Sequence, residues 1–168
     1  MRGLRTIFAL FMMLSCLAWG PAQAATVVAL GASNTFGKGV ARNQAYPAQL
    51  EAILRAKGMN VRVVNAGING DTTGGMLRRM DRATPKGTDV VIIQPGGNDA
   101  RKGSAGDRAA NISEMKSRLS ARGIKVIVME NSAFRGLPKQ PDGQHMTPQG
   151  YRMLAESVAS EVAGAVGR

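Results

Sequence analysis

Cysteine, histidine and aromatic side chains are all scarce in this sequence, and each scarcity excludes a class of site. The 168 residues include one cysteine, Cys16, and one histidine, His145. A disulfide framework, a cysteine-ligated metal centre and a usual zinc site all need more of these side chains. Aromatic residues make up 4% of the chain, too few for the stacking platforms that hold nucleic-acid bases. We therefore expect no metal and no nucleic-acid partner, and no motif indicates a cofactor.

Negative charge is also in short supply. The chain has 22 Lys and Arg residues against 11 Asp and Glu, a formal net charge of +11 at pH 7. Such a balance attracts anionic partners in general, but the basic residues are spread along the sequence rather than clustered. The charge is therefore typical of a solvated surface with some attraction to anionic lipid, and it identifies no specific partner. The sequence likewise does not indicate an oligomeric state.

Long hydrophobic runs are absent except for one, which lies at the N-terminus. Arg2 and Arg5 precede a nearly unbroken apolar run at 7–19. The dipeptide GP at 20–21 ends the run, and the small residues of AQA follow at 22–24. A run of this length is too short to span a bilayer, which needs about 20 apolar residues. The pattern predicts a secretory signal peptide over residues 1–24 and a single domain over residues 25–168, located in the periplasm or secreted.

A lipoprotein-type signal is the minor alternative for this N-terminal segment. In that case Cys16, in the tripeptide LSC at 14–16, would carry the lipid. The apolar run continues beyond Cys16, which fits that type of signal poorly. Export is expected under either interpretation.

Apolar, β-branched segments alternate with helical patterns along the rest of the chain. The strand-like segments are 26–30, 61–65, 90–94 and 124–129. The helical segments are 47–57, a weaker one at 76–83, 108–121, and a last one that Thr147 caps and that runs to about 166. Nearly continuous apolar strands are typical of a parallel sheet buried on both faces. The alternation predicts an α/β fold in three layers, α/β/α, without a second domain.

Small polar residues follow three of the predicted strands directly. The turns read GASN at 31–34, AGINGD at 66–71 and PGGND at 95–99. Asp142 and His145 come just before the last predicted helix. The carboxyl ends of parallel strands meet at one edge of the sheet, where such folds bind their ligands. We therefore expect these four loops to converge.

The residue types in those loops suit acyl transfer. A serine hydroxyl is a weak nucleophile that needs an adjacent base, and a histidine oriented by a carboxylate can serve as that base. Glycine backbone N–H groups and an asparagine amide can donate to the oxyanion that forms. A phosphate-binding loop in ASNTFGKG at 32–39 is excluded, because Ala32 stands where glycine is required and Gly39 where the magnesium-binding hydroxyl belongs.

Four segments resemble the SGNH (GDSL-type) esterase and lipase family in order and in spacing. They are VALGASNTFGKGV, VVNAGINGDTT, IIQPGGNDA and DGQHMTPQGY. The resemblance covers most of the chain after the signal peptide. AYPAQLEAIL and NAGINGDTTGG are most similar to periplasmic arylesterase, acyl-CoA thioesterase and lysophospholipase members. The resemblance to this family implies a flavodoxin-like parallel sheet with strand order 2-1-3-4.

The resemblance also implies a role for each candidate residue. Ser33 would be the nucleophile, His145 its base, and Asp142 the carboxylate that orients His145. The backbone N–H groups of Ser33 and Gly67 and the side chain of Asn98 would form the oxyanion hole. Simpler interpretations stay open, since Ser33 and Asn98 also suit turns and caps, and Gly67 suits a plain turn.

Two departures from the family pattern bear on activity. Ala32 stands where the family has the aspartate of Gly-Asp-Ser, so we expect a looser nucleophile turn and reduced rather than absent activity. Ten residues separate Asn131 from Asp142, where family members carry several tens. A wall of the substrate cleft is therefore missing, and an open site favours small acyl groups or acyl groups on bulky carriers. We expect Asp71 and Asp99 to brace loops rather than to act in catalysis.

Three functions are consistent with these features. The leading hypothesis is an exported serine esterase that cleaves small-molecule carboxylic esters or thioesters through an acyl-Ser33 intermediate. A carbohydrate O-acetylesterase of the same fold is the second, because short loops and an open cleft suit a polymer. A catalytically weakened binding module is the third, and Ala32 and the shortened segment motivate it.

Overall fold

The computed structural model describes residues 23–167. The predicted signal peptide over 1–24, including Cys16, lies outside the described residues except for positions 23 and 24, so this assignment stays a prediction. Within residues 23–167, no helix combines the length and the apolar character needed to cross a membrane.

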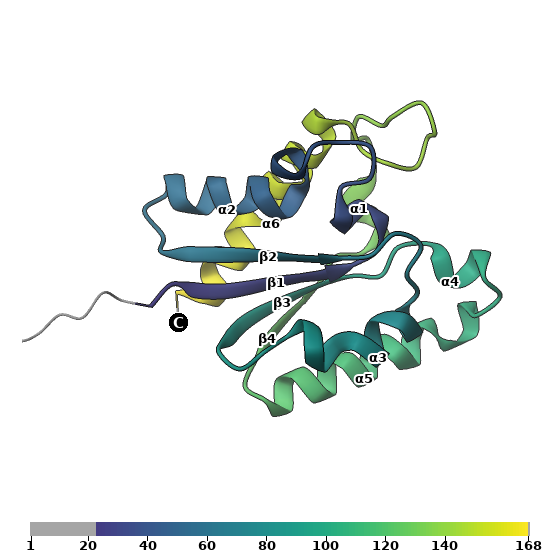
Figure 1. Ribbon diagram of the computed structural model, residues 1–168, viewed down its shortest axis with the longest axis horizontal. Helices are drawn as coiled ribbons and strands as arrows, with labels where there is room; N and C mark the ends of the chain where they lie inside the picture. The colour runs from purple at the N-terminus through teal and green to yellow at the C-terminus, as the bar shows by residue number, and fades with distance from the viewer. Residues whose placement is uncertain (1–22, 168) are drawn as a thin grey trace, which may run out of the picture.

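Four parallel strands form the central sheet (Figure 1). They are β1 (Ala25–Gly31), β2 (Val61–Gly67), β3 (Thr88–Gln94) and β4 (Lys125–Val128), in the order β2-β1-β3-β4. The register places Val27 of β1 between Val63 of β2 and Val90 of β3. The predicted strand order 2-1-3-4 is therefore confirmed.

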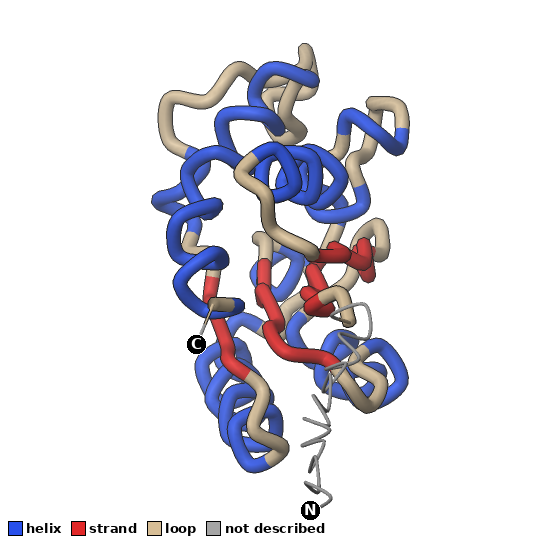
Figure 2. The backbone as a smooth tube through the Cα atoms, turned by 90° about the vertical axis from the view of Figure 1, so that its left-hand side faces the viewer, coloured by secondary structure: helices blue, strands red, loops and turns tan. Residues whose placement is uncertain are grey.

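Helices cover both faces of the sheet, which gives the predicted three layers (Figures 1 and 2). Helices α2 (Tyr46–Ala56) and α6 (Pro148–Val166) pack together on one face. Helices α3 (Thr73–Ala83) and α5 (Arg108–Ala121) cover the other. Short helices lie in the connections: α1 (Ser33–Phe36), α4 (Asn98–Arg101) and the 3-10 turns η1 (Arg42–Gln44), η2 (Ala105–Asp107) and η3 (Asn131–Phe134).

The apolar runs divide between the two faces residue by residue, because side chains alternate along a strand. In β1, Val27 and Ala29 pack under α2 and α6. Val28 and Leu30 pack against α3 and α5 on the opposite face. All four side chains are fully buried. A strand buried on both faces must be apolar throughout, which is the pattern that predicted it.

Two helix starts are fixed by threonine side chains. Thr147 Oγ1 accepts a hydrogen bond from the Gly150 backbone N–H at 3.1 Å, and Pro148 occupies the first turn of α6, as predicted. Thr72 Oγ1 accepts in the same way from the Gly75 N–H at 3.1 Å, so α3 begins at Thr73. The prediction placed that start at 76, three residues too late.

Candidate active site

The turn between β1 and α1 presents Ser33 at the carboxyl edge of the sheet. A Cβ on Gly31 would lie 2.0 Å from Oγ1 and 2.8 Å from Cβ of Thr35, so the glycine makes room for the Thr35 side chain of α1 against the end of β1. Ser33 is the first residue of α1. At that position the backbone N–H has no acceptor within its own helix. The hydroxyl and the N–H of one residue are both placed where a reacting group could meet them.

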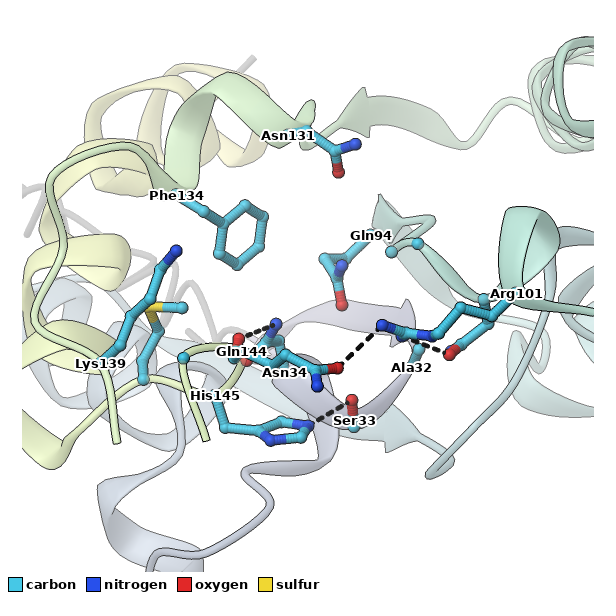
Figure 3. Close-up of a pocket in the computed structure, with 15 residues that line it drawn as sticks. Ala32, Ser33, Asn34, Gln94, Arg101, Asn131, Phe134, Lys139, Gln144 and His145 are labelled. Atoms are coloured by element: carbon cyan, nitrogen blue, oxygen red, sulfur yellow. Dashed lines mark hydrogen bonds between the residues drawn. The ribbon is translucent and has the colours of Figure 1, made fainter. Parts of the chain in front are cut away.

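Hydrogen bonds connect the side chains of Ser33, His145 and Asp142, although Ser33 lies more than a hundred residues before the other two in the sequence. His145 Nε2 lies 2.9 Å from Ser33 Oγ (Figure 3), and His145 Nδ1 lies 2.5 Å from Asp142 Oδ2. Because the carboxylate only accepts, Nδ1 carries the proton and Nε2 accepts from the serine hydroxyl. The His145 side chain is 8% exposed. This is the arrangement in which a histidine can take a proton from serine.

Asp142 is held in its charged form by three donors. The His145 side chain is the largest contributor, and the backbone N–H groups of His145 and Gln144 reach Asp142 Oδ1 at 3.0 and 2.9 Å. Together they hold the pKa of the Asp142 carboxyl well below its ordinary 3.8. The carboxylate therefore stays ionised wherever the protein is folded near neutral pH.

Hydrogen bonds from two neighbouring segments fix the loop that carries His145. The backbone N–H of Gln140 donates to the His145 carbonyl at 2.8 Å, and Gln140 Nε2 donates to the Lys38 carbonyl at 2.8 Å. Asn34 Nδ2 donates to the Gln144 carbonyl at 3.4 Å. The buried Tyr151 of α6 donates to Asn34 Oδ1 at 3.1 Å, and burial raises the pKa of Tyr151 to about 12, so it remains a donor.

Asn98, at the start of α4, supplies an amide to the same edge. Its Nδ2 donates to the Asp71 carbonyl at 2.7 Å, and its Oδ1 accepts from Arg101 Nη2 at 2.7 Å. Arg101 Nη1 also donates to Gln144 Oε1 at 2.8 Å. An amide nitrogen has two hydrogens, of which the Asp71 carbonyl accepts one, and Asn98 lines the same pocket as Ser33.

Gly67 does not occupy the position that the sequence predicted for it. Its backbone N–H donates to Asn65 Oδ1 at 3.0 Å, and its Cα packs against α1, where a Cβ would lie 2.1 Å from the Phe36 nitrogen. The assignment of Gly67 to the oxyanion hole is therefore wrong in this structure. The loop after β2 reaches Asn98 further along, through the Asp71 carbonyl, and the glycine next to that contact in the chain is Gly70.

Asp71 and Asp99 brace loops, as predicted. Asp71 Oδ2 pairs with Arg79 Nε at 2.8 Å, and Arg79 Nη2 also donates to the Gly31 carbonyl at 3.0 Å. The buried Asp99 accepts from the Thr73 hydroxyl at 2.6 Å and from the Thr73 N–H at 3.1 Å. Each carboxylate thus ties the loop of its own strand to α3 or to the nucleophile turn.

The active-site side chains line a pocket of about 190 Å³ (Figure 3). Ser33, His145 and Asn98 line it, and Arg101, Phe134 and Lys139 lie around them. Ala32 also lines it, 2% exposed and packed in the core under α3 and α5. Among residues 23–167, no three His, Cys, Asp or Glu side chains gather in a group that could hold a metal ion. The contacts made by Arg101, Gln144 and Gln140 were not foreseen from the sequence.

Comparison with known proteins places this site in a family. The GDSL-like lipase/acylhydrolase family matches residues 29–166. An esterase named TesA from Pseudomonas aeruginosa is 34% identical over 110 residues, which cover 64% of this chain and 55% of that protein. An arylesterase from Vibrio mimicus is 32% identical over 120 residues, covering 68% of this chain and 58% of that one. The chain thus spans little more than half the length of these two relatives.

A solved structure supports the same grouping. AlinE4, described as an SGNH-hydrolase family esterase, is 27% identical with a TM-score of 0.60. The superposition covers 86% of this chain and 81% of AlinE4. The likeness therefore extends over most of both folds.

Proposed function

The chain belongs to the GDSL-like lipase/acylhydrolase family of SGNH hydrolases, and on that premise we propose that it hydrolyses small carboxylic esters through an acyl-Ser33 intermediate. The observation that carries the proposal is the Asp142–His145–Ser33 relay, with its distances of 2.5 and 2.9 Å. Thioesters fit the same chemistry, because a thiolate is also a leaving group that His145 can protonate.

The proposed reaction has two halves. His145 Nε2 takes the Ser33 proton while Ser33 Oγ attacks the ester carbonyl carbon. The carbonyl oxygen becomes an oxyanion that the Asn98 amide and the Ser33 N–H stabilise. The bond to the leaving alcohol then breaks, and the alcohol departs with the proton from His145. Water repeats the sequence on the acyl-Ser33 ester, which releases the acid and restores the serine.

Asp142 has a fixed task in both halves. Its carboxylate accepts from His145 Nδ1, which keeps Nε2 free to act as the base. When Nε2 gains the proton, the imidazolium has a negative charge 2.5 Å away. Asp142 thereby stabilises the charge that forms in the transition state without changing its own protonation.

The test is a pair of alanine substitutions with an active-site probe. We expect Ser33→Ala and His145→Ala each to remove nearly all hydrolysis of p-nitrophenyl acetate, and the double variant to lose little more, because the two side chains act as a unit. A fluorophosphonate probe should label the unsubstituted protein at Ser33. Labelling that persists in Ser33→Ala, or full turnover by either single variant, would contradict the proposal.

A carbohydrate O-acetylesterase is the second candidate, and the pocket favours it. A pocket of about 190 Å³ is smaller than the roughly 300–1,000 Å³ of most small-molecule sites. An acetyl group fits such a space while a polymer chain remains outside. Release of acetate from acetylated xylan or peptidoglycan, compared with release of fatty acid from lysophospholipid, separates the two candidates.

We also propose that the protein acts outside the cytoplasm. The support is the N-terminal pattern of two arginines, an apolar run at 7–19 and AQA at 22–24, which is typical of a cleaved secretory signal. Fractionation of cells that express the full chain tests this, since the exported protein should begin at Ala25. A product that keeps its original N-terminus in the cytoplasm would exclude export.

A further inference from the structure

We propose that Arg101 is a positioning residue that fixes the orientation of the Asn98 amide and ties it to the loop carrying His145. The inference rests on the proposed function, since it concerns the oxyanion of the same reaction. Arg101 ends the short helix α4 that Asn98 begins. Its guanidinium lies at the edge of the pocket above Ser33 (Figure 3).

The Asn98 amide can serve the oxyanion in only one of its two orientations. A flip of the amide exchanges its oxygen and its nitrogen. A guanidinium offers donors alone, and Arg101 Nη2 lies 2.7 Å from Asn98 Oδ1. The Asp71 carbonyl offers an acceptor alone, 2.7 Å from Asn98 Nδ2. A flip would place two donors together on one side and two acceptors on the other, so both partners hold the nitrogen in place.

Arg101 contributes more than a steric stop, because it is charged. A cation on the amide oxygen draws electron density toward that oxygen and makes the N–H groups better donors. One of these groups is already given to the Asp71 carbonyl. With Arg101 in place, the remaining N–H is a stronger donor to a negative oxygen at Ser33 than it would be without the cation. The charge of Arg101 thus acts on the oxyanion through Asn98 and needs no contact with the substrate.

The second contact joins the two sides of the pocket. Arg101 Nη1 donates to Gln144 Oε1 at 2.8 Å. Gln144 stands next to His145 in the chain, and its backbone N–H donates to Asp142 Oδ1 at 2.9 Å. One guanidinium therefore spans from the oxyanion donor to the segment that sets the position of the base. Arg101 therefore contacts both the Asn98 amide and the loop that carries His145.

A double-mutant cycle tests whether Arg101 acts through Asn98. The four proteins are the unsubstituted chain, Arg101→Met, Asn98→Ala and the double variant, with kcat and KM measured for p-nitrophenyl acetate. We expect Arg101→Met to lower kcat about tenfold, a fraction of what loss of an oxyanion donor costs, with KM within about twofold. In the Asn98→Ala background the same change should cost clearly less, about threefold at most, because the amide that Arg101 orients is gone and only its contact with Gln144 is lost.

Two further variants sharpen the result. Arg101→Lys keeps a cation, but its donors sit on a single nitrogen and not on the fork that reaches both partners, so it should regain part of the lost kcat. Arg82→Met, at an exposed site in the last turn of α3, removes the same charge far from the pocket and should leave kcat unchanged. Thermal unfolding of the Arg101 and Arg82 single variants should stay within a few degrees of the parent, since both side chains are exposed.

The possible outcomes separate this inference from the proposed function. An equal loss from Arg101→Met with and without Asn98 would mean that Arg101 does not act through Asn98, and a change confined to KM would mean that it acts on substrate binding. Either result would overturn the inference. An equal loss from Arg82→Met would reduce the effect to net charge and overturn it as well. A parent protein that neither turns over ester nor takes up the fluorophosphonate at Ser33 would refute the proposed function, and this inference with it.

Discussion

Asp142 carries the clearest pH signature of any single residue in the site. Its pKa is lowered by the His145 side chain first and by two backbone N–H groups second. A lowered pKa in the folded state gives stability that is complete above the ordinary value of 3.8 and is lost as pH falls toward the folded value. The hydrogen bonds to this carboxylate therefore stabilise the fold at neutral pH and cease to do so in acid.

Asp142→Asn tests this dependence. The variant has no charge to titrate, so the difference in unfolding free energy between it and the parent should narrow from about pH 5 to about pH 2. At pH 7, kcat should fall by roughly 10²–10⁴, since an amide no longer fixes the imidazole tautomer or stabilises its charge. Urea unfolding at several pH values measures the first effect. Asp107→Asn, at an exposed carboxylate in η2, is the control. A difference in unfolding free energy between Asp142→Asn and the parent that stays constant with pH would contradict the explanation.

Arg79 takes part in bracing the nucleophile turn where Ala32 leaves no carboxylate. Its guanidinium joins Asp71 Oδ2 at 2.8 Å to the Gly31 carbonyl at 3.0 Å. The Arg79 and Asp71 side chains are 13% and 11% exposed. We expect Arg79→Met to lower the unfolding free energy by about 2–3 kcal/mol, because it leaves a mostly buried carboxylate without its partner.

The same variant should slow catalysis more than it weakens binding. Gly31 directly precedes Ala32 and Ser33, so a looser turn misplaces the hydroxyl and lowers kcat while KM changes little. Chemical denaturation and steady-state kinetics on Arg79→Met measure the two effects. Arg78→Met, at the exposed neighbouring position, is the matched control. Equal stability of the two variants would show that Ala32 needs no such brace.

Among the connecting elements, α1 depends on a glycine in the neighbouring strand. A Cβ at Gly67 would lie 2.1 Å from the Phe36 nitrogen and 2.6 Å from the Phe36 Cα. Both are backbone atoms, so the whole of α1 must move away from β2. Gly67→Ala should therefore cost about 1–3 kcal/mol of unfolding free energy and should lower activity, because α1 begins with Ser33.

The experiment also separates packing from catalysis at this position. Alanine keeps its backbone N–H, so an oxyanion role alone would leave stability unaffected. Thermal unfolding of Gly67→Ala is compared with that of Gly106→Ala, whose added Cβ meets nothing within 4 Å. If both variants unfold at the same temperature as the parent, the close approach of β2 to α1 does not require glycine at position 67.

The elements that the sequence predicted correctly are those with a repeating apolar pattern. Helix α5 was predicted with both of its ends, Arg108–Ala121. Strand β4 is Lys125–Val128, one residue shorter at each end than the apolar run 124–129. Helix α3 starts three residues before the predicted position 76, because Thr72 Oγ1 caps it by accepting from the Gly75 N–H. The sequence did not indicate this start, since Gly74 and Gly75 are poor helix formers. A four-residue helix such as α1 is too short to show any period.

In the site, residue type was predictable where chemistry restricts it. One histidine in the whole chain left no other imidazole to pair with Ser33, and the nearby Asp142 followed from the same block. Arg101 was not predictable, because it is one of 22 Lys and Arg residues and no spacing marks it. Gly67 was misassigned because a glycine contributes through its backbone, and sequence does not say which way an N–H points.

For the molecule as a whole, the ten-residue connection after Asn131 determines how much substrate the site encloses. That connection contributes Phe134 and Lys139 to the lining of a pocket of about 190 Å³, and Asn131 lines it just before the connection begins. This volume is below the roughly 300–1,000 Å³ of most small-molecule sites. An acyl group of two to four carbons fits, while a long chain must extend into solvent and gains little from burial.

A series of p-nitrophenyl esters from two to sixteen carbons measures this preference. We expect kcat/KM to be highest at two to four carbons and to fall about tenfold or more by twelve. Phe134→Ala should move the optimum toward longer chains, because removing the ring lengthens the pocket along one side, whereas Met153→Ala on the outer face of α6 should leave it in place. A parent protein with its best turnover at twelve carbons or more would mean that the acyl chain binds outside this pocket. The short connection would then not be what sets the substrate.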